Sequence, residues 1–290
     1  MTARVLEWVL QEQRAGHRVA LASVLNTSGS VPGKTGARLA VSSRNESWVG
    51  TVGGAGLEKT VLNRCRELLA EATAPFAEVH TYGLNKGAKG YEVTPLDSLC
   101  GGRVTVSIEV MIPMPNVYIM GGGHCGEALA LCLDRLEWSY SVHDTREEFV
   151  SIEKYPTAQS RSTVPADAVF SEETAESLQR FSDVLLLGHD WAEDQQRLLA
   201  LLRLVHEAGL ALNGVEAPRV GVIGSRSKWQ TFEAVCLEAG IPSTLLAQVV
   251  CPIGLNIGAQ TPQEIAVAVV AQIMAAYKNV DPNEATWRQS

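Results

Sequence analysis

The sequence lacks the features that mark several classes of protein. No apolar run reaches the roughly 18–20 residues of a membrane-spanning helix, and the first residues lack the basic, apolar and small-residue order of a signal peptide. Acidic residues outnumber basic ones, and the formal net charge of −8 disfavours nonspecific binding to nucleic acid or to anionic membranes. We therefore expect a cytoplasmic protein with neither a nucleic acid nor a membrane as its partner.

Motifs for zinc, metalloprotease and hydrolase sites are also missing. The histidines form no H-x-x-x-H or H-E-x-x-H pair, and there is no G-x-S-x-G nucleophile elbow. The cysteines include no C-x-x-C pair and show no zinc spacing, so we expect no metal site and reduced thiols, most of them in the core. The cysteines are Cys65, Cys100, Cys125, Cys132, Cys236 and Cys251.

The chain of 290 residues, 46% of them hydrophobic, is long enough for one large or two ordinary domains. Residues 1–112 are predicted to form a smaller α+β domain. Pro113 and Pro115 flank a change of pattern, after which residues 116–278 are predicted to form a Rossmann-like α/β domain and 279–290 a polar tail. The first domain's expected strands are 19–25, 37–42, 48–52, 76–82 and 104–111, its expected helices are 4–14 and 57–69, and residues 83–95 are expected to be a loop.

A glycine-rich junction between a strand and a helix organises the second domain. The apolar run 117–120 is followed by Gly121, Gly123 and Gly126, which form G-x-G-x-x-G at the start of a helix expected over 124–137. In this motif the glycines permit a tight turn, a close backbone approach to a pyrophosphate and close packing of helix on strand. The free N–H groups of the helix N-terminus favour an anionic ligand.

The residues that follow fit the same fold. Asp144 ends the next expected strand, 139–143, close to the roughly 20-residue offset at which an acid meets a ribose hydroxyl in dinucleotide-binding domains. Two further buried strands are expected at 184–187 and 220–223, whereas residues 151–172 show no clear pattern. Together these elements predict a doubly wound parallel sheet.

A second candidate anion site follows the strand 220–223. Gly224, Ser225, Arg226, Ser227 and Lys228 combine a strand end, a helix N-terminus, two hydroxyls and two cations. Because strand carboxyl ends face the ligand crevice in such sheets, these groups are predicted to meet a phosphate. The alternative is an ordinary capped and solvated helix start.

Histidines and carboxylates are expected at the same edge of the sheet. His189 and Asp190 follow the strand 184–187, His124 lies in the glycine-rich junction, and Asp194 follows nearby. With Asp144 such a group could bind a metal or move protons. No metal-binding spacing supports a metal site, and for His124 a packed or hydrogen-bonding role is favoured over a catalytic one.

One thiol stands out in the first domain. Cys100 precedes Gly101 and Gly102, which would leave the thiol unshielded and let a ligand approach the backbone. The alternative of equal weight is a small residue in a tight turn before a strand. Cys125 and Cys251 are weaker candidates.

Taken together, ordered motifs along nearly the whole chain resemble the xanthine dehydrogenase accessory factor family, the XdhC/CoxI-type proteins. Two positions depart from the family pattern, because Gly33 separates Pro32 from Lys34 and Ala55 interrupts a glycine run. The motifs are 29–32, 36–37, 50–54 with Glu58, 100–102, 123–126, Asp144 with Arg146, 221–226, 252–255 and 261–266.

The resemblance implies an accessory factor rather than an enzyme. Such a chaperone binds and protects the molybdenum cofactor, in mononucleotide or dinucleotide form, and supports its sulfuration with a cysteine desulfurase as partner. It then delivers the cofactor to an apo molybdenum hydroxylase of the xanthine dehydrogenase type, and we expect a homo-oligomer. The candidate cofactor-binding residues are Gly53, Gly54, Gly101, Gly121, Gly123, His124, Gly126, Asp144, Arg146, Gly224, Ser225, Arg226 and Lys228, with Cys100 as the candidate functional thiol.

Two other classes remain open from the residues alone. The first is an NAD(P)-dependent oxidoreductase, in which Asp144 would hold the adenosine ribose. The second is a non-catalytic nucleotide sensor or scaffold. The first domain contains no recognisable hydride-transfer site but does contain the glycine-framed Cys100, which favours the chaperone.

Overall fold

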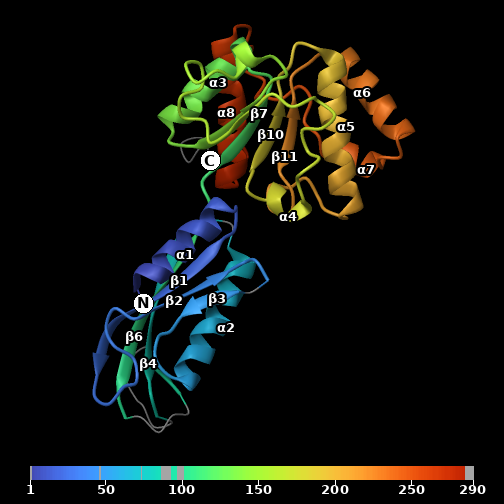
Figure 1. Cartoon of the computed structure of the whole chain (residues 1–290). Coiled ribbons are helices and arrows are strands. Elements are labelled where there is room, and N and C mark those ends of the chain that lie inside the picture. Colours follow the sequence, from blue (N-terminus) through green and yellow to red (C-terminus); the bar gives the residue numbers. More distant parts are fainter. Residues whose placement is uncertain (1, 46, 73, 86–92, 97–100, 285–290) are drawn as a thin grey trace. The chain divides into compact units, whose positions relative to one another are not determined.

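A computed structural model describes residues 2–45, 47–72, 74–85, 93–96 and 101–284. The chain divides into two compact units, Met1–Pro113 and Met114–Ser290. Each unit contains its own sheet and apolar core (Figure 1). The predicted fold class, a Rossmann-like parallel-sheet domain preceded by a smaller domain of helices and mixed strands, is confirmed.

Within the described residues of the first unit, six strands form a mixed sheet in the order β3-β2-β1-β6-β4-β5. Alternate residues of β6, from Val104 to Val110, face helix α2, while α1 packs on the other face against Val19 and Ala40. The elements are α1 (Thr2–Arg14), β1 (Val19–Ser28), β2 (Arg38–Ser42), β3 (Trp48–Gly50), α2 (Ala55–Glu71), β4 (Phe76–Gly83), β5 (Val93–Pro95) and β6 (Arg103–Met111).

The second unit is built on a parallel sheet whose described strands lie in the order β11-β10-β7-β8-β9. The first strand of the unit is therefore central, with later strands added on both sides. Its strands are β7 (Asn116–Met120), β8 (Ser139–His143), β9 (Arg161–Ser162), β10 (Asp183–Leu186) and β11 (Arg219–Val222). Its helices are α3 (His124–Arg135), the 3-10 turn η1 (Glu147–Phe149), α4 (Ala175–Leu178), α5 (Trp191–Glu207), α6 (Arg226–Glu238), α7 (Ser243–Leu246) and α8 (Pro262–Lys278).

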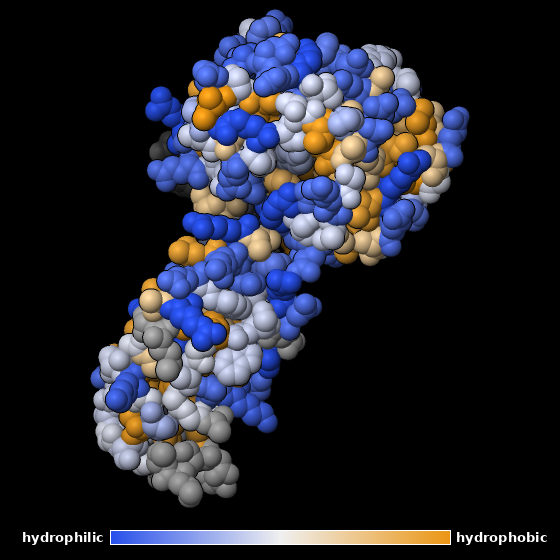
Figure 2. Space-filling model, viewed as in Figure 1, coloured by the Kyte–Doolittle hydropathy of each residue, from blue (hydrophilic) through white to orange (hydrophobic). Residues whose placement is uncertain are grey.

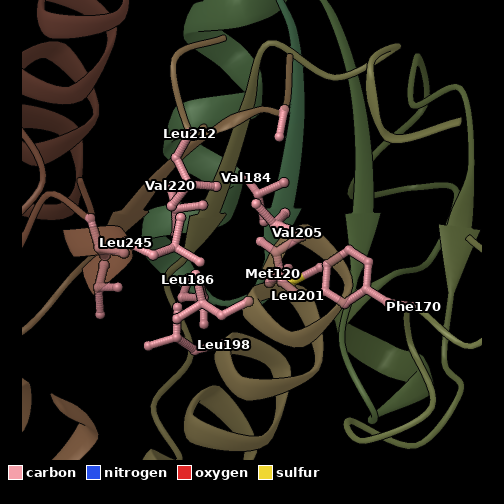
Figure 3. Packing of buried hydrophobic residues seen from close by; sticks show 14 of the residues in the cluster. Met120, Phe170, Val184, Leu186, Leu198, Leu201, Val205, Leu212, Val220 and Leu245 are labelled. Atoms are coloured by element: carbon pink, nitrogen blue, oxygen red, sulfur yellow. The ribbon is translucent and has the colours of Figure 1, made fainter. Parts of the chain in front are cut away.

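Both faces of this sheet are covered by helices, which explains the continuous apolar runs of its strands. On one face Val117 and Ile119 of β7 pack with α3 and α8. On the other face Met120 packs with residues of β10, β11 and α5 (Figure 3). The sheet is thus fixed from both sides, and its carboxyl edge carries the loops that lead into α3, α5 and α6.

The sequence-based boundaries need correction at several points. The loop expected over 83–95 ends in the short strand β5, which pairs in parallel with the end of β4. The strand expected over 48–52 ends at Gly50, and the unassigned stretch 151–172 contains the two-residue strand β9. Helix α8 begins with a capping box, in which Thr261 and Glu264 exchange hydrogen bonds.

The described helices include none that is both long and apolar enough to cross a membrane. On the visible face of the second unit hydrophilic residues cover much of the surface, with hydrophobic ones among them (Figure 2). Single exposed apolar side chains such as Leu131 are ordinary in folded proteins.

Candidate functional site

Two glycines, Gly121 and Gly188, allow the backbone to approach closely where the chain leaves β7 and β10. A Cβ atom on Gly121 would lie 2.6 Å from the backbone nitrogen of Gly188, so only glycine permits this approach. Gly121 also has a φ of +116°, which side chains rarely tolerate. The glycine loop (residues 121–126) therefore lies where the strand order reverses, the place where doubly wound sheets bind ligands.

The glycine loop leaves the N-terminus of α3 open. Gly123 is the N-cap, and no side chain of the described residues caps the helix. Apart from its two chain neighbours, no described residue has an atom within 4 Å of where a Cβ on Gly123 would be. The N–H groups of Gly123, His124 and Cys125 donate to no atom of the described residues. These groups could bind an anion.

The neighbouring helices at this edge begin differently, because side chains cap them. The carboxylate of Asp190 accepts a hydrogen bond from the N–H of Ala192 at 2.8 Å at the start of α5. The hydroxyl of Ser225 accepts one from the N–H of Lys228 at 3.3 Å at the start of α6. Asp190 and Ser225 therefore have local structural roles, and for Ser225 this is the alternative that the sequence left open.

Asp144 lies against the glycine loop. Its Oδ2 accepts a hydrogen bond from the N–H of Gly122 at 2.9 Å, and its Oδ1 accepts one from the N–H of Arg146 at 3.1 Å. The Arg146 guanidinium donates two further hydrogen bonds, from Nε to Oδ1 at 2.9 Å and from Nη2 to Oδ2 at 3.0 Å. Burial alone would raise the pKa of Asp144, but the hydrogen bonds from Arg146 and Gly122 outweigh it and lower the pKa below its ordinary value.

The residues after Asp144 cover the glycine loop from one side. The carbonyl oxygen of Phe149 would lie 1.9 Å from a Cβ on Gly122, so the two backbones are in direct contact. The Phe149 ring lies beneath the Arg146 guanidinium, with 3.8 Å from Cζ to the ring centroid. Further along, Lys154 pairs with Glu127 of α3 at 2.5 Å, and the hydroxyl of Tyr155 lies beside Gly126. We call residues 146–155 the covering segment.

A buried charge network lies beneath the same edge of the sheet. The Nζ of Lys228 donates to Oδ2 of Asp194 at 2.8 Å and to the carbonyl of Ile223 at 3.1 Å. Arg197 donates to the other Asp194 oxygen at 3.0 Å and to Glu193 at 2.8 Å. Asp194, Arg197 and Lys228 are 0%, 1% and 3% exposed. This network pairs two cations with two anions and joins α5 to α6 and to the end of β11.

The network changes the interpretation of the predicted anion site at α6. Lys228, predicted to meet a phosphate, is engaged inside the protein, whereas Arg226 is exposed at the first residue of the helix. No acidic residue lies in that first turn, although acidic residues are the ones that a helix N-terminus favours. An exposed cation in this position is unfavourable for the helix, which is consistent with a role in holding an anion.

Sequence reasoning missed Glu193, Arg197 and Phe149. A signal for Arg197 existed, since it precedes Leu198 on the face of α5 that carries Leu201 and Leu202 into the core. The histidines and carboxylates of this edge do not assemble a metal site: no cluster of three metal-ligating side chains occurs in the described part of the chain.

The first unit brings its own glycine motifs together. A Cβ on Gly53 would lie 2.2 Å from the Cα of Gly33, and one on Gly102 would lie 2.4 Å from the side chain of Val31. Gly54 is the N-cap of α2, which has no side-chain cap. Glu58 accepts a hydrogen bond from Thr51, whose hydroxyl in turn accepts one from the N–H of Gly53 at 3.1 Å.

These contacts form a glycine cluster from segments that are distant in sequence, namely residues 31–33, 51–54 and 102. Gly101 is exposed next to it. Cys100, the candidate thiol, lies outside the described residues. The described cysteines are all free, and Cys65 and Cys236 are buried. Burial raises the pKa of Cys65 to about 12 and that of Cys236 to about 11, which disfavours the reactive thiolate at both positions.

The parallel sheet, the glycine loop and the separate first unit define a two-unit α/β protein with a Rossmann-type domain. The chain belongs to the XdhC/CoxI family: the XdhC Rossmann domain model matches residues 117–273, and the XdhC and CoxI family model matches residues 12–83.

Similar proteins include Uncharacterized protein YqeB of Escherichia coli (strain K12), 29% identical over 260 residues. That match covers 90% of this chain and 44% of YqeB, so the chain spans less than half the length of this relative. Among solved structures, a xanthine dehydrogenase from Bacillus halodurans is 18% identical with a TM-score of 0.44, covering 96% of this chain and 98% of that one. The GsuK RCK domain is 11% identical with a TM-score of 0.32, and the match covers 93% of this chain and 51% of that one.

Proposed function

We propose that the chain is an accessory protein for molybdenum hydroxylases. It binds the molybdenum cofactor, protects it, supports its sulfuration and delivers it to an apo enzyme of the xanthine dehydrogenase type, with a cysteine desulfurase as partner. The observation that carries this proposal is that both units match models of the XdhC/CoxI family.

The second unit supplies groups suited to the phosphate of this cofactor. The N–H groups of Gly123, His124 and Cys125 are open at the N-terminus of α3, and Gly123 leaves room for an oxyanion. Arg226 and the Ser227 hydroxyl lie exposed at the same edge of the parallel sheet. When bound, the cofactor supplies the molybdenum centre, and the chain's own residues hold and shield it.

Mass spectrometry of protein purified from a molybdenum-replete host tests cofactor binding. We expect a molybdopterin species in wild-type protein and loss of most of it in Arg226→Ala. Arg203→Ala, which removes an exposed arginine from the fourth turn of α5, is the matched control and should retain the cofactor. Wild-type protein that carries no pterin would contradict the proposal.

The sulfuration role rests on Cys100, which precedes the exposed Gly101 beside the glycine cluster. Cys100→Ser should leave folding nearly intact and lower the sulfurated fraction of a co-expressed molybdenum hydroxylase. Cys132→Ser is the control, since Cys132 packs against the apolar core between α3, α8 and the sheet, and should lower stability with little specific effect. Wild-type maturation by Cys100→Ser protein would remove the thiol from the mechanism.

A further inference from the structure

We infer that the covering segment closes one side of the Rossmann-type site, namely the side toward the end of β8 where dinucleotide-binding domains hold the adenosine; we call this the nucleoside side. The glycine loop then accepts a terminal phosphate and not the pyrophosphate of a dinucleotide. The inference rests on the proposed function in one respect, namely that the glycine loop is where the cofactor phosphate binds. It specifies the ligand of that loop: the mononucleotide form of the cofactor, with nicotinamide dinucleotides excluded.

The first reason is that the acid expected to hold a ribose is already engaged. In dinucleotide-binding domains the acid at the end of the second strand accepts hydrogen bonds from the adenosine ribose. Here that acid is Asp144, which is 2% exposed. Four donors fill its two oxygens, one from Gly122 and three from Arg146, at 2.9–3.1 Å. A ribose would have to displace charge-assisted hydrogen bonds in a buried position.

The second reason is that the covering segment occupies the space beside the loop. Phe149 approaches Gly122 so closely that its carbonyl would lie 1.9 Å from a Cβ there. Two cations, Arg146 at 3.8 Å and Lys154 at 4.6 Å, lie over the ring of Phe149. A nucleoside leaving the loop toward the end of β8 would therefore meet protein.

The third reason is that the segment is fastened at both ends. Arg146 is held by Asp144, while Lys154 pairs with Glu127 on α3. Tyr155 is fully buried, and its ring packs edge-on against Tyr140 of β8 at 6.3 Å between centroids. Opening the nucleoside side would break these contacts together. The covering segment therefore stays in place as long as the second unit is folded.

The other side of the loop is different. Gly123 has open space, and the chain from β11 supplies the exposed Arg226 at the same sheet edge. A phosphate ester whose organic part extends away from Asp144 is therefore compatible with the loop. The pterin cofactor in its mononucleotide form is such an ester, whereas a dinucleotide carries a second organic group that would point toward the covering segment.

Titration with NADH, followed by its own fluorescence, tests the closure. We expect no saturable binding to wild-type protein up to about 1 mM. The double variant Arg146→Ala/Phe149→Ala frees the Asp144 carboxylate and should bind NADH saturably with a Kd of about 0.1 mM or lower, tenfold below the limit set for wild type. Arg135→Ala, at the exposed end of α3, is the control and should behave as wild type.

Two outcomes would overturn the inference. One is saturable NADH binding to wild-type protein that Asp144→Asn abolishes. The other is a cofactor, retained by purified wild-type protein, that is exclusively in the dinucleotide form; the proposed function would then stand and the closure would be wrong. Protein that retains no molybdopterin and binds no NADH would contradict the proposed function while leaving the closure intact.

Discussion

The ammonium of Lys228 lies 2.8 Å from the carboxylate of Asp194, and both side chains are almost completely buried. Arg197 lies on the other oxygen of the same carboxylate. One anion thus stabilises two cations. Removing it leaves Lys228, among the described residues, with the carbonyl of Ile223 as its one remaining hydrogen-bond acceptor. A buried ion pair is costly to break from one side, because the remaining charge keeps its desolvation cost.

We therefore expect Asp194→Ala to lower the free energy of unfolding of the second unit by about 3–5 kcal/mol. Urea unfolding monitored by circular dichroism measures this. Arg203→Ala on the same helix is exposed and should stay within about 0.5 kcal/mol of wild type. A Lys228→Met/Asp194→Ala double variant should lose less than the sum of the single losses, and strict additivity would show that the pair is not coupled.

Substitution of Arg226 should change stability and ligand affinity in opposite directions. Arg226→Glu places an anion at the N-terminus of α6, where it interacts favourably with the helix dipole, so stability should rise by about 0.3–1 kcal/mol. Affinity for a phosphorylated pterin should fall by at least the roughly 1.5–3 kcal/mol of a lost charge-assisted hydrogen bond. Thermal unfolding and cofactor retention together check this, and a variant that keeps its cofactor would remove Arg226 from the site.

Asp144 should make the second unit sensitive to acid. Its pKa is lowered in the folded state, so its contribution to stability is complete above the ordinary carboxyl value of about 3.9 and is lost as the pH falls through the lower folded-state pKa. Asp144→Asn should be less stable than wild type at neutral pH, and the difference should shrink below about pH 4. Melting temperatures between neutral and acid pH measure it; a constant difference would show that Asp144 does not titrate in this way.

The buried thiols should resist alkylation in the folded protein. The pKa values of Cys65 and Cys236, raised to about 12 and about 11, leave almost no thiolate at about pH 8. Iodoacetamide labelling followed by peptide mass spectrometry should find both unmodified in native protein and modified after unfolding. Rapid labelling of Cys65 before unfolding would show that the core of the first unit opens readily.

The cap of α8 offers a local test of the fold. The hydroxyl of Thr261 accepts a hydrogen bond from the N–H of Glu264 at 3.3 Å, and the Glu264 carboxylate accepts one from the N–H of Thr261 at 2.9 Å. Thr261→Ala should cost about 1 kcal/mol of the unfolding free energy, as loss of an N-cap usually does. Gln263→Ala, at an exposed position in the same turn, is the control in the same denaturation experiment.

The elements that could be predicted from the sequence are those encoded by neighbouring residues. The glycine loop follows an apolar run and precedes an amphipathic helix, and the α8 cap occupies four consecutive positions. By contrast, β5 and β9 are only two or three residues long and exist because they pair with the ends of β4 and β8 across an intervening loop. Hydrophobic periodicity carries no information about such pairing.

The candidate site shows the same division. That Lys228 lies near a helix start was evident from the sequence, but its direction toward Asp194 depends on α5 and α6 lying side by side at one sheet edge. Likewise, Asp144 was found by its offset from the glycine loop, whereas its engagement by Arg146 depends on the turn that follows β8. Sequence spacing gives the position of a charged residue; the packing of neighbouring elements decides what that charge contacts.

The apolar clusters described above each draw their members from a single unit, two from the first and two from the second. Cooperativity of unfolding arises within a shared core, so we expect each unit to unfold in a transition of its own. A single free energy for the whole chain is then not a defined quantity. A substitution in one core can halve the free energy of unfolding of that unit while the other unit stays folded. Unfolding of either unit alone is enough to stop a process that needs both.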